Sequence, residues 1–239
     1  MQVGADALNK KTTMKLLSLF LTLISFLANA QTTPSGIPLN SPWKEKVYQF
    51  AVENLKHPAW GLAHAERDYQ LTQSILKDSQ ENFDEEVLFA AAYFHDLGGM
   101  DAFTVEGVDH AVRSAQLAEE KLPTFEFPIG KIPQVQEIIL GHTYYGPTPN
   151  SVFAKAFRDA DILDFLGAMG VARLLSATKD LDPNFSSLAP AHDLIKKFQN
   201  NLPAKISLPA SHSKLEIKLT ETKNFLEAFD KWTYGGSAR

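Results

Sequence analysis

The sequence has 239 residues, of which 44% are hydrophobic and 21% are charged, and its formal net charge at pH 7 is −5. A chain of this length can bury one sizeable core, and its acidic balance argues against a nucleic-acid polymer as partner, because such binders need a basic surface. The chain contains no cysteine, which excludes disulfides, thiolate catalysis, cysteine-ligated zinc and iron–sulfur clusters.

Residues 1–30 have the layout of a secretory signal peptide. Lysines precede the apolar run LLSLFLTLISFLA, and ANA at 28–30 is a small-residue cleavage pattern. A single membrane anchor is the alternative, but the run is short for a full span of roughly 20 residues. Met14 is a second possible start. We therefore expect an exported, periplasmic or secreted protein that begins at Gln31 and has no stable membrane insertion after cleavage.

Hydrophobic residues recur at helical spacing beyond a flexible, Pro-, Ser- and Thr-rich lead-in at 31–41. Ser41 as N-cap and Pro42 at the first helical position start the first of these segments. The pattern predicts helices over residues 42–55, 64–77, 84–97, 109–121, 132–142, 150–175 (broken near Asp159), 188–200 and 214–231. No segment shows sustained period-2 alternation. The sequence thus predicts an all-α fold, one compact domain over 42–239 with eight or nine helices.

Polar side chains stand at the ends of several apolar helices. His95 and Asp96 end a helix whose apolar residues face a core, and His142 ends another. A buried carboxylate without a partner is costly, so Asp96 needs a cation or a metal ion. A neighbouring histidine and aspartate can present one nitrogen and one oxygen ligand to one ion. Taken alone, each histidine is also typical of an ordinary surface position or of a hydrogen-bonded core position that binds no metal.

An acidic stretch begins the predicted helix FRDADILDFLGAMGVAR. Asp159, Asp161 and Asp164 lie within this short run. Any one of them can simply cap the helix, whereas a carboxylate near His64 and the His–Asp pair would complete a metal site. Spacing alone leaves both interpretations open.

Five segments, taken in order, resemble the HD-domain superfamily of metal-dependent phosphohydrolases, in its small single-domain bacterial branch. HAERDYQL resembles the H-x-x-R helix of that family, and AAYFHDLG resembles its HD helix. DHAVRSAQLAEE, IILGHTYY and FRDADILDFLGAMGVAR are similar to its later helices. The likeness extends over about residues 45–231. It implies an HD-type helical domain and a metal-dependent hydrolase.

The resemblance also implies a ligand set. Four residues match the ligands of the family's primary metal ion: His64, His95, Asp96 and Asp161. Asp161 is preferred over Asp159 because the family's ligand follows an alanine and precedes a hydrophobic turn. In branches with two metals, two further histidines lie between the HD pair and the last aspartate, and His110 and His142 occupy such places. Asp96 would then bridge the two ions.

Two positions depart from the family pattern. The residue directly after the metal aspartate is usually an arginine, and here it is Ile162. Position 68, usually apolar in the first helix, is Asp68. Neither change touches the implied ligands, but the lost arginine removes a charge from the rim of the site. We therefore expect substrate preference to differ from that of relatives.

Imidazoles mixed with carboxylates suit divalent transition metals, namely Mn, Fe, Co, Ni or Zn, as one or two ions. Such ions activate water and offset charge on a phosphate. The expected catalytic residues are Asp96, His110 and His142, and either histidine could protonate the leaving oxygen in place of binding a second ion.

Basic and aromatic residues near the motifs are candidate substrate contacts. Four cationic side chains could clamp a phosphate, or form surface salt bridges instead: Arg67, Arg113, Lys155 and Arg158. Tyr144 and Tyr145 could stack on a base or pack at the rim. His57, His192 and His212 are left outside the predicted site.

The sequence favours a metal-dependent hydrolase of phosphate esters, of the phosphomonoester or nucleotide class, acting on a small phosphorylated substrate. HD-like scaffolds also support a diiron oxygenase or a nitrile-hydrating lyase, so the resemblance implies a metal site more firmly than a phosphate substrate. A metal-stabilised binding module without catalysis is the third interpretation. The presence of both His110 and His142 argues against it, because a closed structural site needs only four ligands.

Overall fold

The computed structural model describes residues 31–184 and 186–233. The chain divides into an N-terminal unit that ends at Pro42 and a helical unit that begins at Trp43. The predicted signal peptide, residues 1–30, lies outside the described residues. Among the residues described, no helix combines the length and the apolar character needed to cross a membrane.

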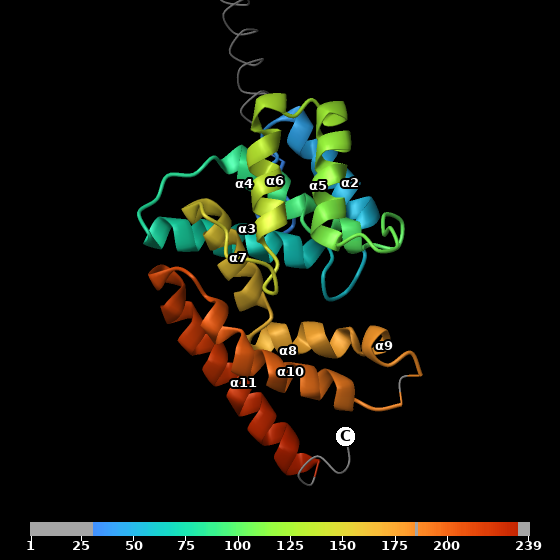
Figure 1. The fold of residues 1–239 in the computed structure, drawn as a ribbon, viewed down its shortest axis with the longest axis vertical. Helices are drawn as coiled ribbons and strands as arrows, with labels where there is room; N and C mark the ends of the chain where they lie inside the picture. Colours follow the sequence, from blue (N-terminus) through green and yellow to red (C-terminus); the bar gives the residue numbers. More distant parts are fainter. Residues whose placement is uncertain (1–30, 185, 234–239) are drawn as a thin grey trace, which may run out of the picture. The chain divides into compact units, whose positions relative to one another are not determined.

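The described part of the chain is helical, which confirms the all-α prediction (Figure 1). The α-helices are, in chain order, α2 (Pro42–Asn54), α3 (Leu62–Asp78), α4 (Glu85–Phe94), α5 (His110–Lys121), α6 (Ile132–Gly141), α7 (Val152–Asp164), α8 (Gly167–Ser176), α9 (Thr178–Leu181), α10 (Ala189–Asn201) and α11 (His212–Trp232). Short 3-10 turns connect some of them: η1 (Leu97–Gly99), η2 (Leu122–Phe125), η3 (Ile129–Lys131), η4 (Pro203–Lys205) and η5 (Pro209–Ser211). The short helix α9 has no counterpart in the prediction.

Side-chain caps fix the starts of three helices that matter for the site. Asp84, Asp109 and Ser151 accept hydrogen bonds from backbone N–H groups in the first turns of α4, α5 and α7. Such a cap typically stabilises a helix by about 1 kcal/mol. The first helix begins at Pro42 as predicted. The cap expected from Ser41 is wrong, because its hydroxyl has no hydrogen-bond partner in the described chain.

The predicted break in the helix over 150–175 occurs later than expected. The chain breaks between α7 and α8, not near Asp159. Gly167 has a φ of +76°, a left-handed conformation that most residues avoid. Its N–H donates to Thr222 Oγ1 at 2.7 Å, which fixes the break against α11. Nothing in the local periodicity of the sequence indicates this long-range contact.

Asp159 has a structural role inside α7. Its buried carboxylate accepts hydrogen bonds from the N–H groups of Ser207 and Leu208 at 2.8 and 2.9 Å, and from Ser211 Oγ at 2.8 Å. These bonds hold the segment that leads into α11. The expectation of a helix break here is therefore wrong. The Asp159 carboxylate accepts hydrogen bonds from a distant loop, and the helix continues through Asp159.

The hydrophobic core of the helical unit encloses α4 and the facing sides of its neighbours. Every residue from 87 to 94 is fully buried. A second cluster joins α3, α7, α8, α10 and α11, and includes Ile75, Leu163, Leu174 and Phe198. Burying one such side chain stabilises the fold by about 1.5–3 kcal/mol. Figure 1 shows α8, α10 and α11 packed on one another, and α3 packs extensively on α7.

Candidate metal centre

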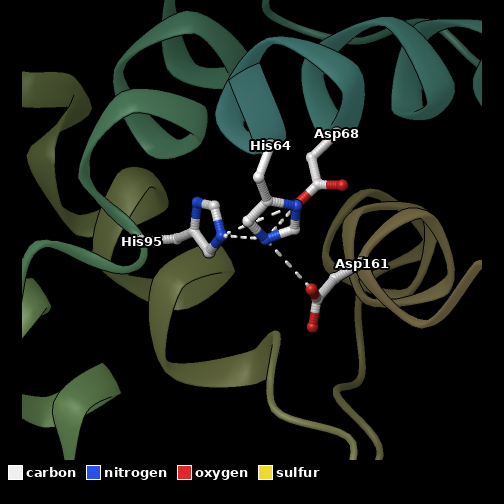
Figure 2. A group of neighbouring side chains, drawn as sticks. All are labelled: His64, Asp68, His95 and Asp161. Atoms are coloured by element: carbon white, nitrogen blue, oxygen red, sulfur yellow. Dashed lines mark hydrogen bonds and ion pairs between the residues drawn. The ribbon is translucent and has the colours of Figure 1, made fainter. Parts of the chain in front are cut away.

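Helix ends converge on a buried cluster of histidines and aspartates. His64 lies in the first turn of α3, His95 directly follows α4, and Asp161 lies in the last turn of α7. Figure 2 shows these side chains and Asp68 pointing toward a common centre. His64, Asp68, His95 and Asp161 each offer one ligand atom, and these atoms lie within 4.8 Å of one another. The helix packing thus brings together residues that are up to a hundred positions apart in sequence.

The distances within this cluster suit a divalent ion. His64 Nε2 lies 3.2 Å from both Asp68 Oδ2 and His95 Nε2. It lies 3.4 Å from Asp161 Oδ1 and 3.5 Å from Asp96 Oδ2. Two ligands that each stand roughly 2.1 Å from one ion are roughly 3.0 to 3.4 Å apart in octahedral to tetrahedral geometries. The donor types and their spacing therefore fit a bound metal ion.

The rings of both inner histidines are oriented by their Nδ1 atoms. His64 Nδ1 lies 2.9 Å from Asp164 Oδ2, and His95 Nδ1 lies 2.9 Å from the carbonyl oxygen of Ala92. With a proton on each Nδ1, that atom donates to its oxygen acceptor and Nε2 keeps its lone pair. Such supporting contacts raise the basicity of a metal-binding imidazole and fix its orientation.

Asp164 contacts His64 and belongs to a network of ion pairs that the sequence did not predict. Its carboxylate accepts a hydrogen bond from Arg67 Nε at 2.8 Å and lies 2.9 Å from Arg173 Nη1. The side chains of Asp164 and Arg173 are almost completely buried. In the sequence, Asp164 was one of three candidate helix caps. Its spacing of three residues from Asp161, one turn along the same helix, is the signal that could have identified it.

A second group of ligand atoms lies beside the first. His110 Nε2 and His142 Nε2 are 3.1 Å apart. Asp96 Oδ1 is 3.5 Å from His110 Nε2 and 3.6 Å from His142 Nε2, whereas Asp96 Oδ2 faces His95 Nε2 at 3.4 Å. The two oxygens of one carboxylate therefore face two different pairs of imidazoles. His142 Nδ1 donates to the carbonyl oxygen of Ile139 at 2.5 Å, so its Nε2 is also directed at the site.

A glycine two residues after Asp96 permits this arrangement. Gly98 donates its N–H to Ser114 Oγ on α5 at 2.8 Å. A Cβ atom at this position would stand 2.3 Å from the carbonyl oxygen of His110, which is a severe clash. The absence of a side chain therefore lets η1 approach the start of α5, and this contact brings His110 beside Asp96.

Electrostatics prepare the inner residues to bind a cation. Burial raises the pKa of Asp96, but its histidine neighbours outweigh burial, with His95 foremost, and the pKa lies well below its usual value. Burial and the Arg173 guanidinium lower the pKa of His64, yet the surrounding aspartates raise it well above its usual value. Burial raises the pKa of Asp68, although His64 opposes this. Asp68 is thus a carboxylate that needs a cation nearby in order to ionise.

The pKa values of the two outer histidines shift in opposite directions. Burial lowers the pKa of His110 even though Asp96 and Asp109 act in the opposite direction. Burial also lowers the pKa of His142, but Asp96 and Asp161 outweigh it and the net shift is upward. His110 is therefore a neutral imidazole at neutral pH, able to bind a metal or to exchange a proton.

A pocket of about 270 Å³ opens onto the outer histidines. Its walls combine site residues with aromatic rings, and the lining residues are Trp60, Asp96, Gly99, His110, His142, Thr143, Tyr144, Tyr145, Asp161 and Phe165. Among the described residues, no lysine or arginine is part of this lining. The pocket therefore offers aromatic surface and metal ligands without fixed positive charge.

Two of the candidate phosphate clamps form contacts within the fold. Arg67 forms an ion pair with Asp164. Arg113 donates to the carbonyl oxygen of Phe103 at 3.3 Å and lies 3.1 Å from a carboxylate oxygen of Glu120. Neither residue lines the pocket. A role for them in binding substrate stays a prediction.

The other two candidate clamps lie on α7. Arg158 is buried, and its guanidinium donates to Thr148 Oγ1 at 2.8 Å and to the carbonyl oxygens of Tyr144 and Gly146 at 3.1 Å. Arg158 thus holds the loop that carries the two tyrosines. Lys155 is half-buried near the start of α7. Neither lines the pocket, and substrate contact by either stays a prediction.

The histidines left outside the predicted site have other partners. His57 Nε2 lies 3.0 Å from Asp180, and His192 Nε2 lies 2.9 Å from Asp230. His212 begins α11. His57 is close to His64 in sequence, but its contact with Asp180 directs it away from the metal ligands.

The two departures from the family pattern have different environments. Ile162 is fully buried in the hydrophobic cluster around α7, where it contributes to packing. Asp68 is also fully buried, but it lies in the cluster of candidate metal ligands. Sequence reasoning noted Asp68 only as an exception. Its position one helical turn after His64 is the signal that could have placed it near the ion.

Comparisons with known proteins identify what this architecture is similar to. The family model described as HD domain matches residues 61–166. The chain is similar to a Lactobacillus plantarum protein at 19% identity, with a TM-score of 0.60 and coverage of 85% of this chain and 100% of that one. It is similar to an HD-superfamily hydrolase from Bacillus thuringiensis at 22% identity, with a TM-score of 0.56 and coverage of 80% and 96%.

Bacillus subtilis YpgQ, solved in complex with ADP, is 21% identical to this chain, with a TM-score of 0.57 and coverage of 79% of this chain and 94% of YpgQ. At these identities the similarity to solved structures shows a shared fold. No curated protein sequence matches the chain.

Proposed function

We propose that this chain, whose residues 61–166 match the HD-domain family model, is a metal-dependent hydrolase of phosphate esters, of the phosphomonoester or nucleotide class. The observation that supports this most directly is the carboxylate of Asp96. Its Oδ2 lies 3.4 Å from His95 Nε2, and its Oδ1 lies 3.5 Å from His110 Nε2. A carboxylate shared between two pairs of imidazoles is suited to hold two ions next to each other.

The proposed cofactor is one or two divalent ions of Mn, Fe, Co, Ni or Zn. His64, His95, Asp96 and Asp161 would hold the inner ion, and His110 and His142 would hold an outer one together with Asp96. Such ions lower the pKa of water and offset negative charge on phosphate oxygens. That contribution matters here because the pocket lining contains no lysine or arginine in the described chain.

The residues around the pocket would bind the organic part of the substrate and move protons. Trp60, Tyr144 and Phe165 offer ring faces and edges on which a nucleobase or another aromatic group can pack. When only the inner ion is bound, His110 would instead exchange a proton with the leaving oxygen, because its side chain is 30% exposed and can reach a bound substrate. YpgQ has the same fold and was solved in complex with ADP, which supports a nucleotide as the class of substrate proposed for this chain.

The first test is the metal content of the purified protein, measured by elemental analysis beside Asp96→Ala. We expect about one or two equivalents of a transition metal, lost in the variant. Nucleoside monophosphates and simple phosphomonoesters, supplied with that metal, should then release inorganic phosphate. A wild-type protein that stays metal-free after loading would contradict the proposal. Bound iron with oxygen consumption and no phosphate release would identify an oxygenase instead.

We also propose that the protein acts outside the cytoplasm. The support is the basic, apolar and small-residue pattern of residues 1–30, which lie outside the described structure. Expression of the full chain in a bacterium should give an envelope or secreted form whose amino terminus is Gln31. A cytoplasmic product that retains its first residues would contradict this.

A further inference from the structure

Asp68 is the member of the cluster to which the family pattern assigns no role. It lies one helical turn after His64 on α3, and it is 0% exposed. Within the described chain, neither of its carboxylate oxygens accepts a hydrogen bond. A buried carboxylate without a donor is costly unless a cation offsets its charge. In its ionised form, Asp68 therefore requires a positive partner.

The nearby protein cations pair with a different carboxylate. Arg67 Nε lies 2.8 Å from Asp164 Oδ1, and Arg173 Nη1 lies 2.9 Å from Asp164 Oδ2. Both guanidinium groups are therefore engaged by Asp164.

The atoms that face Asp68 are metal-ligating nitrogens. Asp68 Oδ2 lies 3.2 Å from His64 Nε2 and 3.6 Å from His95 Nε2. The Nδ1 atoms of both rings are engaged elsewhere, so these Nε2 atoms point at the same volume as the Asp68 oxygen. Figure 2 shows Asp68 directed toward this volume from the helix that carries His64. The spacing is that of ligands around one ion.

We propose that Asp68 is a fifth protein ligand of the inner metal ion, beside His64, His95, Asp96 and Asp161. This inference rests on the metal centre of the proposed function and is independent of its substrate. Two imidazoles and three carboxylates then surround one ion, one donor more than a tetrahedral zinc site accepts. An oxygen-rich set of five donors favours an ion of higher coordination number, such as Mn²⁺, over Zn²⁺.

The test is titration of the metal-free, full-length protein with Mn²⁺, with free Mn²⁺ followed by electron paramagnetic resonance. Asp68→Asn keeps the shape of the side chain and removes its charge. We expect this variant to bind Mn²⁺ at least about tenfold more weakly than wild type and to lose less affinity for Zn²⁺. Its metal-free thermal midpoint should be unchanged or higher, because a buried charge without a hydrogen-bond donor is removed.

Asp159→Asn is the matched control. Asp159 is another fully buried aspartate, but it accepts hydrogen bonds from the N–H groups of Ser207 and Leu208 and lies outside the ligand cluster. This variant should lose thermal stability and keep the wild-type affinity for Mn²⁺. The two substitutions are thus expected to separate the two effects: Asp68→Asn weakens metal binding without loss of stability, and Asp159→Asn lowers stability without loss of metal binding.

Wild-type affinity for Mn²⁺ in Asp68→Asn would overturn the inference and leave Asp68 as an internal partner of protonated His64. If that variant does not fold, a crystal structure of the Mn²⁺-loaded wild type decides the question. An Asp68 oxygen about 2.2 Å from the ion supports the inference, and one beyond about 3.5 Å overturns it. A wild type that binds no divalent ion overturns both this inference and the proposed function. Binding without phosphate-ester turnover overturns only the proposed function.

Discussion

The inner and outer halves of the metal centre are built differently. In the inner half, His64 and His95 are 2% and 1% exposed, and the side chain of Asp164 and the carbonyl oxygen of Ala92 hold their rings. In the outer half, the His110 side chain is 30% exposed and lines a pocket. Under the proposed function, the buried half would hold an ion and the open half would also meet the substrate.

The supports of the two halves differ as well. Asp164 is buried in α7 and is fixed by two arginines. On the outer side, Tyr145 Oη lies 3.2 Å from His110 Nδ1, and Tyr145 is 56% exposed on the loop between α6 and α7. A buried ionic support resists motion, whereas an exposed loop can adjust when a substrate enters.

Asp96→Ala should have the largest effect, because Asp96 faces both halves. We expect loss of bound metal and a fall in phosphate-ester turnover of about 10³-fold or more. Elemental analysis and a phosphate-release assay measure the two effects together. The exposed Asp101, which follows the same turn, provides the control as Asp101→Ala. Metal retained in full by Asp96→Ala would exclude the shared-ligand role.

His110→Gln should affect the outer half alone. We expect turnover to fall about 10²-fold, because the group that reaches the substrate is lost. The inner ion should remain, so the metal content should fall by no more than one equivalent. His57→Gln, which changes an imidazole that contacts Asp180 instead, should leave both values unchanged. Loss of all metal in His110→Gln would show that the two halves do not bind ions separately.

Asp164→Asn should weaken metal binding by the inner half. The His64 ring loses the carboxylate that orients it, so affinity for the metal should fall about 10- to 100-fold. Arg173, which is buried, loses its ionic partner, and breaking such a pair typically costs about 3–5 kcal/mol. Urea unfolding of the metal-free proteins measures the second effect. Stability equal to wild type would mean that Arg173 finds another partner.

The same substitution has a pH signature. Burial raises the pKa of Asp164, but contact with His64, Arg173 and Arg67 outweighs burial and holds the pKa well below its usual value. A carboxyl group whose pKa is lower in the folded state stabilises the protein above its unfolded pKa of about 3.9, and this contribution is lost as the pH falls further. Metal-free wild type should therefore lose its stability advantage over Asp164→Asn below about pH 4. A constant difference down to lower pH would contradict this assignment.

The sequence indicated the candidate ligands better than the residues that support them. Helical periodicity and capping signals indicated where helices end, and the candidate ligands His95, His142 and Asp161 lie at or near those ends. The resemblance then selected which polar residues to group. The contact between His64 and Asp164 depends on how α3 packs against α7, a hundred residues away, and local periodicity contains no information about that packing.

Two further features depended on tertiary structure. The break between α7 and α8 requires the left-handed Gly167 and a hydrogen bond from the Gly167 N–H to Thr222 Oγ1, so its position was not predictable from the apolar pattern. Arg158 was visible as a cation near the site, but its three acceptors belong to a loop whose path is not encoded by spacing. Asp68 was visible as an exception, and only its burial beside two imidazoles shows why the exception matters.

Tyr145→Phe should have the smallest effect and tests the outer support directly. The Tyr145 hydroxyl donates to Asp109 Oδ2 at 2.6 Å and lies beside His110 Nδ1. Its removal should loosen the His110 ring and lower turnover by no more than about tenfold, with metal content unchanged. Tyr144→Phe is the matched control, because it keeps the ring that lines the pocket and packs on Phe198 and removes only a hydroxyl, and it should leave turnover unchanged. Equal losses in both variants would mean that the Tyr145 hydroxyl has no specific role in positioning His110.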